Sequence, residues 1–377
     1  MSLLHLKNIL CIRPDNMGDL IMTAPAMRAL KESFDAKITV LTSSMAKGIV
    51  KHIPEIDDAL IFDMPWVKTP DTPDAESINQ IVSVIKERSF DAAVIFTVYS
   101  QSPLPTAMLA YLAGIPKVLA YCRENPYHLL TDWVPDKEPY TLIEHQVRRD
   151  LDLVATIGAF TDNENLYLMV QEELWQLITK KLIETGVDIN KPWLILHAGV
   201  SERKREYPIR KWADAAQKLI SEKGYQILLT GSLDEKPLTD ALENIIGEGS
   251  FSVAGLFNLD EFVCLVKHAP IMLSVNTGTV HIAAAVGTPV VVLYAQTNPQ
   301  HTPWNVANKV LQFPVPAHLH SRNEVIVHVN NSLYNKSIDL PSADDILTAM
   351  DELLNRPGSP AQPFHEIPNE NQAIAAS

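Results

Sequence analysis

Short apolar runs alternate with amphipathic segments along most of the chain. The apolar runs are rich in Val, Ile and Leu and carry few polar residues, which is typical of strands covered on both faces of a parallel sheet. In the first half, the pattern predicts strands at 8–13, 37–43, 59–63 and 92–98, and helices at 18–33, 74–88, 103–113 and 141–158.

The alternation restarts after a polar, turn-rich segment at 159–166. The second series predicts strands at 193–199, 226–232, 251–255, 271–276 and 289–296, and helices at 170–186, 209–223, 234–247, 259–268 and 279–287. Two βα series of similar size predict an α/β fold of two doubly wound, Rossmann-like domains that face each other across a cleft.

The domain boundary falls near 160–175 by this pattern. We expect an N-terminal Rossmann-like domain over 1–165 and a C-terminal one over 170–355. The tail at 356–377 is rich in Pro, Asn and Ala, and we expect it to be disordered.

Composition narrows the function. A chain of 377 residues suits two hydrophobic cores, and its formal net charge of -14 argues against a nucleic-acid partner. Cys11, Cys122 and Cys264 are far apart, which predicts neither a disulfide framework nor a zinc site. Cys11 and Cys264 lie in apolar runs, where we expect buried thiols. The chain begins without the features of a signal peptide, and no apolar run reaches about 18 residues, so we expect a cytoplasmic protein.

The first strand runs into a Gly18-Asp19 turn that opens a helix. Gly18 permits a tight turn, and Asp19 stands where a carboxylate can point from a rigid support. The alternative is that Asp19 only caps the helix. Thr23 and Pro25 resemble a second helix start, and we expect Arg13 and Arg28, which bracket the turn, at the surface.

A second turn, Asn276 to Thr279, links a strand to a helix rich in small residues. The free amides of Thr277, Gly278 and Thr279 predict an anion site at the amino end of that helix. His281, in its first turn, can add a hydrogen bond. The alternatives are an ordinary βα connection and a structural histidine.

Two further loops follow strand ends in the second domain. Lys204 and Arg205 lie in a basic loop suited to a diphosphate, although a solvated charge run has the same pattern. Glu235 opens a helix after a Gly turn, where a carboxylate can hold ribose hydroxyls or only favour the helix end.

As a set and in this order, these segments resemble the heptosyltransferases of glycosyltransferase family nine. The resemblance spans about residues 8–300 and rests on "MGD…TAPAMRALK", "HAG…YPIRKW", "LTGS…E" and "NTGTVHIAAAVGTPVV", together with "HQVRRDLDLVATIG" at 145–158. It implies the two-domain GT-B architecture, an ADP-heptose donor and a lipopolysaccharide inner-core acceptor.

The resemblance also implies roles for single residues. Asp19 matches the proposed catalytic base, 277–279 the donor-diphosphate turn, and Arg205 (or Lys204) the phosphate-binding lysine. Glu235 lies near the ribose-binding glutamate, and Leu256 and Phe257 fall where main-chain atoms meet the adenine. This chain departs from the family at Asn276, where Asp is usual, at Arg205, where Lys is usual, and at Tyr207, where Trp is usual.

We therefore expect an inverting transfer that needs no metal and no cofactor. The DxD at Asp150 and Asp152, a pattern that some metal-dependent glycosyltransferases use, is interpreted as the solvated face of a helix. The acceptor is expected to be a glycolipid or another anionic glycan, with at most peripheral contact with a membrane. The alternatives are a transferase or epimerase that uses another nucleotide-sugar, and a non-catalytic nucleotide-sugar-binding protein, which the change at Asn276 suggests.

Overall fold

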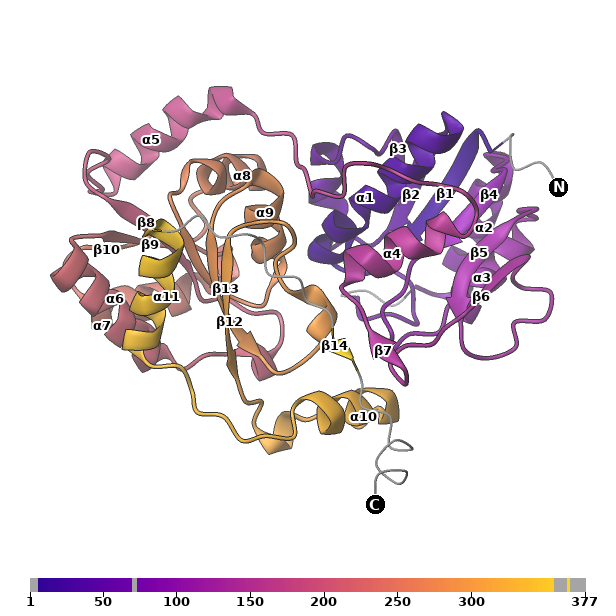
Figure 1. Ribbon diagram of the computed structural model, residues 1–377. Coiled ribbons are helices and arrows are strands. Elements are labelled where there is room, and N and C mark those ends of the chain that lie inside the picture. Colours follow the sequence, from indigo (N-terminus) through magenta and orange to yellow (C-terminus); the bar gives the residue numbers. More distant parts are fainter. Residues whose placement is uncertain (1–5, 70–72, 356–364, 367–377) are drawn as a thin grey trace, which may run out of the picture. The chain divides into compact units, whose positions relative to one another are not determined.

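The computed structural model describes residues 6–69, 73–355 and 365–366. The chain divides into two compact units, 1–165 with 363–377, and 166–362. Each is built on a parallel six-stranded sheet flanked by helices (Figure 1), which confirms the predicted class of two Rossmann-like domains.

The N-terminal unit has the strand order β3-β2-β1-β4-β5-β6. The strands are β1 Asn8–Arg13, β2 Lys37–Thr42, β3 Asp58–Ile61, β4 Ala92–Ile95, β5 Val118–Cys122 and β6 Asp132–Pro135, and the helices are α1 Met17–Phe34, α2 Ala75–Glu87, α3 Leu104–Leu112 and α4 Gln146–Ala155. The order reverses between β1 and β4, and sheets of this kind bind ligands beyond the carboxyl ends of such a strand pair. Gly18 and Asp19 lie in the first turn of α1, which follows β1, so the topology places them at this point. The predicted tight turn at Gly18 is wrong, because Gly18 is a helical residue.

Helix α1 is almost entirely buried, from Gly18 to Leu30. It runs without interruption through Pro25, so the predicted second start at Thr23 and Pro25 is wrong. The hydroxyl of Thr23 lies 3.0 Å from the main-chain oxygen of Asp19, one turn earlier, which is a common arrangement for Thr inside a helix.

The C-terminal unit repeats the plan with the order β10-β9-β8-β11-β12-β13. Its strands are β8 Trp193–His197, β9 Gln226–Leu229, β10 Ser250–Ser252, β11 Met272–Val275, β12 Val290–Ala295 and β13 Asn308–Phe313. Its helices are α5 Trp175–Glu184, α6 Ile209–Lys223, α7 Lys236–Ile246, α8 Leu259–His268, α9 Gly278–Val286, α10 Glu324–Leu333 and α11 Ala343–Asn355.

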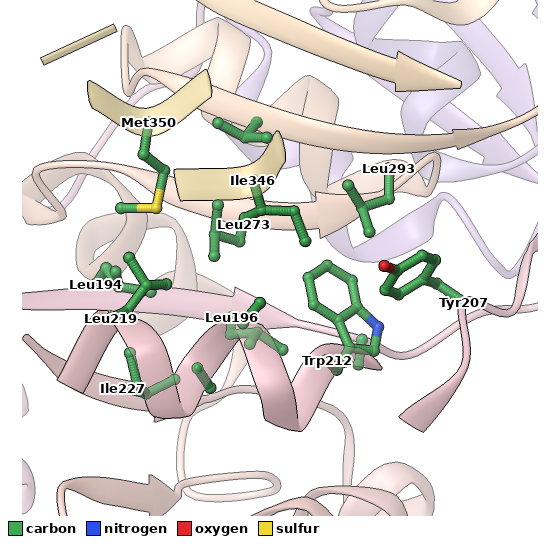
Figure 2. Packing of buried hydrophobic residues seen from close by; sticks show 14 of the residues in the cluster. Leu194, Leu196, Tyr207, Trp212, Leu219, Ile227, Leu273, Leu293, Ile346 and Met350 are labelled. Carbon is green, nitrogen blue, oxygen red and sulfur yellow. The ribbon is translucent and has the colours of Figure 1, made fainter. Parts of the chain in front are cut away.

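One face of the second sheet packs on α6 and α11. Figure 2 shows Trp212 of α6 among the aliphatic side chains of the strands, with Ile346 and Met350 of α11 over the same core. Tyr207 meets Trp212 edge-on, with ring centroids 5.1 Å apart, and its hydroxyl donates to the main-chain oxygen of Pro341 at 2.5 Å. Tyr207 therefore ties the end of the basic loop to this core.

The predicted helix at 141–158 is too long. Residues Leu142–Ile143 form strand β7, and α4 begins only at Gln146 because the His145 side chain accepts a hydrogen bond from the Val147 amide and caps it. The sequence pattern also missed β5, β6, β13, α10 and α11. The tail predicted to be disordered lies outside the described residues, except for strand β14 His365–Glu366, which pairs antiparallel with β7.

No helix within the described ranges is both long and apolar enough to span a bilayer.

Candidate active site

Asp19 lies in the first turn of α1 and is 9% exposed. Its Oδ2 accepts a hydrogen bond from the Asn16 amide at 3.2 Å, so the capping role is present. Its Oδ1 accepts from Arg13 Nη2 at 3.0 Å. The carboxylate is therefore fixed at both oxygens and keeps a small exposed surface, which suits a group that must meet a substrate in one orientation.

Arg13 ends β1 and is fully buried, so the expectation that it lies at the surface is wrong. Its Nε lies 3.2 Å from Asp15 Oδ2, in addition to its bond with Asp19. Gln101 donates to the other oxygen of Asp15 at 2.6 Å. Burial raises the pKa of Asp15, and the charge of Arg13 opposes that rise. One guanidinium thus holds two carboxyls in place.

Arg28 is also buried, against expectation. Its guanidinium contacts Glu55 at 2.6 Å and donates to the main-chain oxygens of Asn163 and Asn165 at 2.7 and 2.9 Å. Arg28 is structural, because it joins α1 to the end of the N-terminal unit.

The interpretation of the DxD as a solvated face is wrong for Asp150, which is 1% exposed. Its carboxyl accepts from Thr23 Oγ1 at 2.8 Å and from Gln146 Nε2 at 2.7 Å. Asp152 is partly exposed and lies 3.6 Å from Arg148. The burial of Asp150 could have been predicted from the sequence, because Val147, Asp150 and Val154 are at helical spacing and lie on the buried face of α4.

In the C-terminal unit, the turn after β11 leads into α9, with Thr277 as its N-cap and Gly278 as its first residue. The Asn276 side chain accepts from the Ala295 amide at 3.1 Å and donates to Thr297 Oγ1 at 3.0 Å. Asn276 therefore joins the end of β11 to the end of β12. The side-chain amide at this position, where the family usually has Asp, is compatible with the turn. The amides of Gly278 and Thr279 stand at the amino end of the helix, where an anion is favoured. The expectation that the Thr277 amide is free is wrong, because it donates to the main-chain oxygen of Val275 at 2.8 Å.

The basic loop lies next to this turn. Arg205 Nη1 donates to the main-chain oxygen of Asn276 at 3.1 Å, and Arg205 and Lys204 both contact Glu202, at 3.4 and 3.1 Å. Among the described residues, the buried Nε of Arg205 has no hydrogen-bond partner. Sequence reasoning predicted this proximity but not Glu202, which neutralises part of the positive charge.

His281 lies inside α9 and is 5% exposed, with its ring edge-on to His301 at 6.3 Å. It is the fourth residue of α9 and so lies in the first turn of that helix.

Glu235 is oriented by a capping box, and two glycines leave space for its side chain. Its Oε2 accepts from the Ser232 amide at 2.7 Å. A Cβ on Gly199 would lie 1.9 Å from Glu235 Oε1, and one on Gly231 would lie 3.0 Å from its Cβ. Both glycines thus make room for the carboxylate. Burial lowers the pKa of the neighbouring His197, and the charge of Glu235 opposes that change.

Leu256 and Phe257 follow β10, and Lys181 of α5 holds them. Lys181 Nζ donates to the main-chain oxygen of Leu256 at 3.1 Å, pairs with Glu261 at 2.7 Å, and lies 5.6 Å from the centre of the Phe257 ring. Sequence pattern does not point to Lys181, because it lies on an amphipathic helix that precedes the loop by about 75 positions.

One group of side chains within the described ranges has ligand atoms close enough together to hold a metal ion: Glu172, Cys264 and His268, within 4.8 Å of one another. His268 already bonds Glu172 at 2.8 Å and stacks on Trp175 at 4.0 Å. Those contacts account for the arrangement without an ion.

Two Rossmann-like units, one with a fixed carboxylate after β1 and the other with a helix amino terminus beside a basic loop, have the architecture of a glycosyltransferase of the GT-B type. The chain belongs to glycosyltransferase family 9, the heptosyltransferase family, whose model matches residues 80–331.

Proteins similar to the chain in sequence include heptosyltransferases. The chain is 26% identical over 309 residues to lipooligosaccharide heptosyltransferase 2 of Haemophilus influenzae, which covers 78% of this chain and 85% of that protein. It is 25% identical to lipopolysaccharide heptosyltransferase 2 of Escherichia coli, over 78% and 84% of the two chains.

Solved structures share the fold. A family 9 glycosyltransferase from Veillonella parvula superposes with a TM-score of 0.75 at 18% identity, covering 94% of this chain and 99% of that one. The E. coli ADP-heptose heptosyltransferase II superposes with a TM-score of 0.68 at 21% identity, covering 92% and 98%.

Proposed function

We propose that this enzyme transfers heptose from ADP-heptose to a lipopolysaccharide inner-core acceptor, with inversion at the anomeric carbon and without a metal ion. The donor and acceptor classes are those named for its relatives, lipopolysaccharide heptosyltransferase 2 and ADP-heptose heptosyltransferase II. We assign acceptor binding to the N-terminal unit and donor binding to the C-terminal unit, with at most peripheral contact with a membrane.

Asp19 acts as the general base in this proposal. The acceptor hydroxyl gives its proton to Asp19 as its oxygen attacks the anomeric carbon, and the bond from that carbon to the diphosphate breaks. The observation that carries the assignment is the fixed orientation of Asp19, held by Arg13 and by the Asn16 amide with part of the carboxylate exposed. A carboxylate held this way does not have to reorient during the reaction.

The leaving ADP gains negative charge, and the C-terminal unit supplies the groups that stabilise it. These are the amides of Gly278 and Thr279, the guanidinium of Arg205 and the ammonium of Lys204, with His281 in the first turn of the same helix. Glu235 binds the ribose hydroxyls, and the main chain at Leu256 and Phe257 meets the adenine. Because cationic side chains and amides supply the stabilisation, the chemistry needs no divalent ion.

The test uses the full chain with ADP-heptose and a lipopolysaccharide acceptor truncated before its heptose. Release of ADP with wild-type protein, in the presence of EDTA, supports the proposal. We expect Asp19→Asn to lower kcat by about a hundredfold or more while the Kd for ADP is unchanged.

Three outcomes oppose the proposal. Turnover by Asp19→Asn at the wild-type rate would show that Asp19 is not the base. Loss of turnover in EDTA, with recovery on addition of Mg²⁺, would show that the reaction needs a metal ion. A thermal-shift screen in which UDP- or GDP-sugars stabilise the protein and ADP-heptose does not would exclude ADP-heptose as the donor.

A further inference from the structure

The Asp150 carboxyl lies in a buried polar cluster, and the reaction described above does not use it. It is 1% exposed and accepts hydrogen bonds from Thr23 at 2.8 Å and Gln146 at 2.7 Å. The two donors come from α1 and α4, which pack against each other. Burial of an ionised carboxyl in the middle of this packing costs stability, which these two hydrogen bonds offset only in part.

Thr23 connects this carboxyl to the turn that carries the proposed base. Its Oγ1 lies 2.8 Å from Asp150 Oδ2 and 3.0 Å from the main-chain oxygen of Asp19. A hydroxyl has one hydrogen, and an ionised carboxylate is the stronger acceptor. The charge on Asp150 therefore decides which of the two acceptors receives the Thr23 hydroxyl.

Positive charge is scarce around Arg13. The guanidinium contacts Asp15 at 3.2 Å and Asp19 at 3.0 Å, and its charge also acts on Asp150. Three carboxyls thus share one cation, and all three cannot be ionised in a buried site without mutual repulsion.

The next guanidinium along α4 does not relieve this shortage. Arg149 contacts Asp136 at 2.9 Å and Glu138 at 2.5 Å, and it lies over the Tyr121 ring at 4.5 Å. Its charge is already balanced by two carboxyls.

We propose that Asp150 is a positioning residue that sets the strength of the catalytic base: when ionised, it competes with Asp19 for the charge of Arg13 and so increases the affinity of Asp19 for a proton. The inference rests on the proposed role of Asp19. The amino end of a helix favours an ionised carboxylate, which makes it a weaker base. A second buried negative charge beside Arg13 counteracts that weakness.

The groups that face Asp150 permit this role. Burial raises the pKa of Asp150 to about 6, opposed by the charge of Arg13, the hydrogen bonds from Thr23 and Gln146, and the charge of Arg149. Cys11 of β1 stays a neutral thiol, because burial raises its pKa. Asp150 is thus mostly ionised at pH 7.5 and mostly protonated at pH 5.

The test is the pH dependence of kcat in Asp150→Asn, with Asp152→Asn as the matched control on the exposed side of the same helix. Removing the charge of Asp150 weakens repulsion of the ionised Asp19. We therefore expect kcat of Asp150→Asn to be about threefold below wild type at pH 7.5, where Asp150 is ionised, and equal to wild type at pH 5, where Asp150 is already protonated, with the KM for the donor unchanged. The control keeps the wild-type profile. A ratio of wild-type to Asp150→Asn kcat that stays the same from pH 5 to 7.5, or one that changes equally in the control, overturns the proposal.

A second measurement covers the case in which Asp150→Asn does not fold. The wild-type chain, labelled with ¹³C at the aspartate carboxyls, is titrated by NMR, with Asp19 assigned from the peak missing in Asp19→Asn. We expect the Asp19 resonance to show an inflection at the pH where Asp150 titrates. An Asp19 resonance without that inflection overturns the proposal. The titration does not depend on turnover, so it tests this inference separately from the proposed function. Failure of the proposed function would instead appear as wild-type turnover by Asp19→Asn.

Discussion

Arg205 donates from Nη1 to the main-chain oxygen of Asn276 at 3.1 Å, which joins the basic loop to the turn before α9. The loop and the turn come from different strands, β8 and β11, that are neighbours in the sheet. One hydrogen bond thus sets the distance between the cationic side chain and the helix amides that are proposed to share the diphosphate.

Replacement of Arg205 tests this arrangement. Arg205→Ala removes a charged donor to phosphate, so we expect the Kd for ADP, measured by calorimetry, to rise about tenfold or more. Arg203→Ala is the control, because the Arg203 side chain is 84% exposed and its ion pair with Glu206 is long, at 3.9 Å. Equal affinities in the two variants would exclude Arg205 from the donor site.

Gly199 gives a test of Glu235 that leaves the carboxylate in the chain. A Cβ at Gly199 would lie 1.9 Å from Glu235 Oε1, the far end of a flexible side chain, so in Gly199→Ala the carboxylate moves and the fold persists. We expect a higher Kd for ADP with a nearly unchanged Tm. Gly231→Ala, with its nearest contact at 3.0 Å, should have a smaller effect on the Kd. ADP binding at wild-type affinity by Gly199→Ala would argue against a ribose role for Glu235.

The departure at Asn276 has a structural explanation that predicts which substitutions are tolerated. The Asn276 side chain is the acceptor for the buried Ala295 amide, at 3.1 Å, and an aspartate there could accept the same bond. Asn276→Ala leaves that amide unsatisfied and should lower the free energy of unfolding by about 1–3 kcal/mol. We expect Asn276→Asp to lower it less in urea denaturation. An alanine variant as stable as the aspartate variant would contradict this explanation.

The buried Asp150 predicts a pH dependence of stability. Its pKa is raised by burial to about 6, so the folded state holds the proton more tightly than the unfolded chain. This contribution is fully present below the pKa of an unfolded aspartate, about 4, and is lost as pH rises through about 6, at a total cost of about 3 kcal/mol. The Tm of Asp150→Asn relative to wild type should therefore increase between pH 4.5 and 7.5. A constant difference across this range would mean that Asp150 keeps an ordinary pKa.

Much of this fold follows from the sequence. Buried parallel strands are apolar throughout, and α6 and α8 begin and end at the residues that periodicity predicts, 209–223 and 259–268. Strands β5 and β6 were not predicted, because Tyr121, Asp132 and Pro135 interrupt their apolar pattern. Edge and near-edge strands tolerate such residues, and local pattern does not reveal sheet position.

The proposed site was predictable in its loops and less so in its supports. Asp19, Arg205, Glu235 and the 277–279 turn all lie at strand ends, where doubly wound sheets place their ligands. Arg13 and Asp150 were assigned to the surface because each, taken singly, is a charge on a helix or strand end. Their burial depends on each other and on Thr23, which is 127 positions from Asp150. Local periodicity does not encode such a pairing.

The Lys181 contact has a consequence for how donor preference can change over evolution. Lys181 holds the carbonyl of Leu256, and Glu261 holds both Lys181 and the Asn258 amide, so the loop after β10 is fixed by groups outside it. A nucleobase recognised by the main chain of such a loop is insensitive to which side chains the loop displays. Substitutions at Leu256 or Phe257 could then accumulate without altering base selectivity, whereas a change on α5, remote in sequence, would alter it.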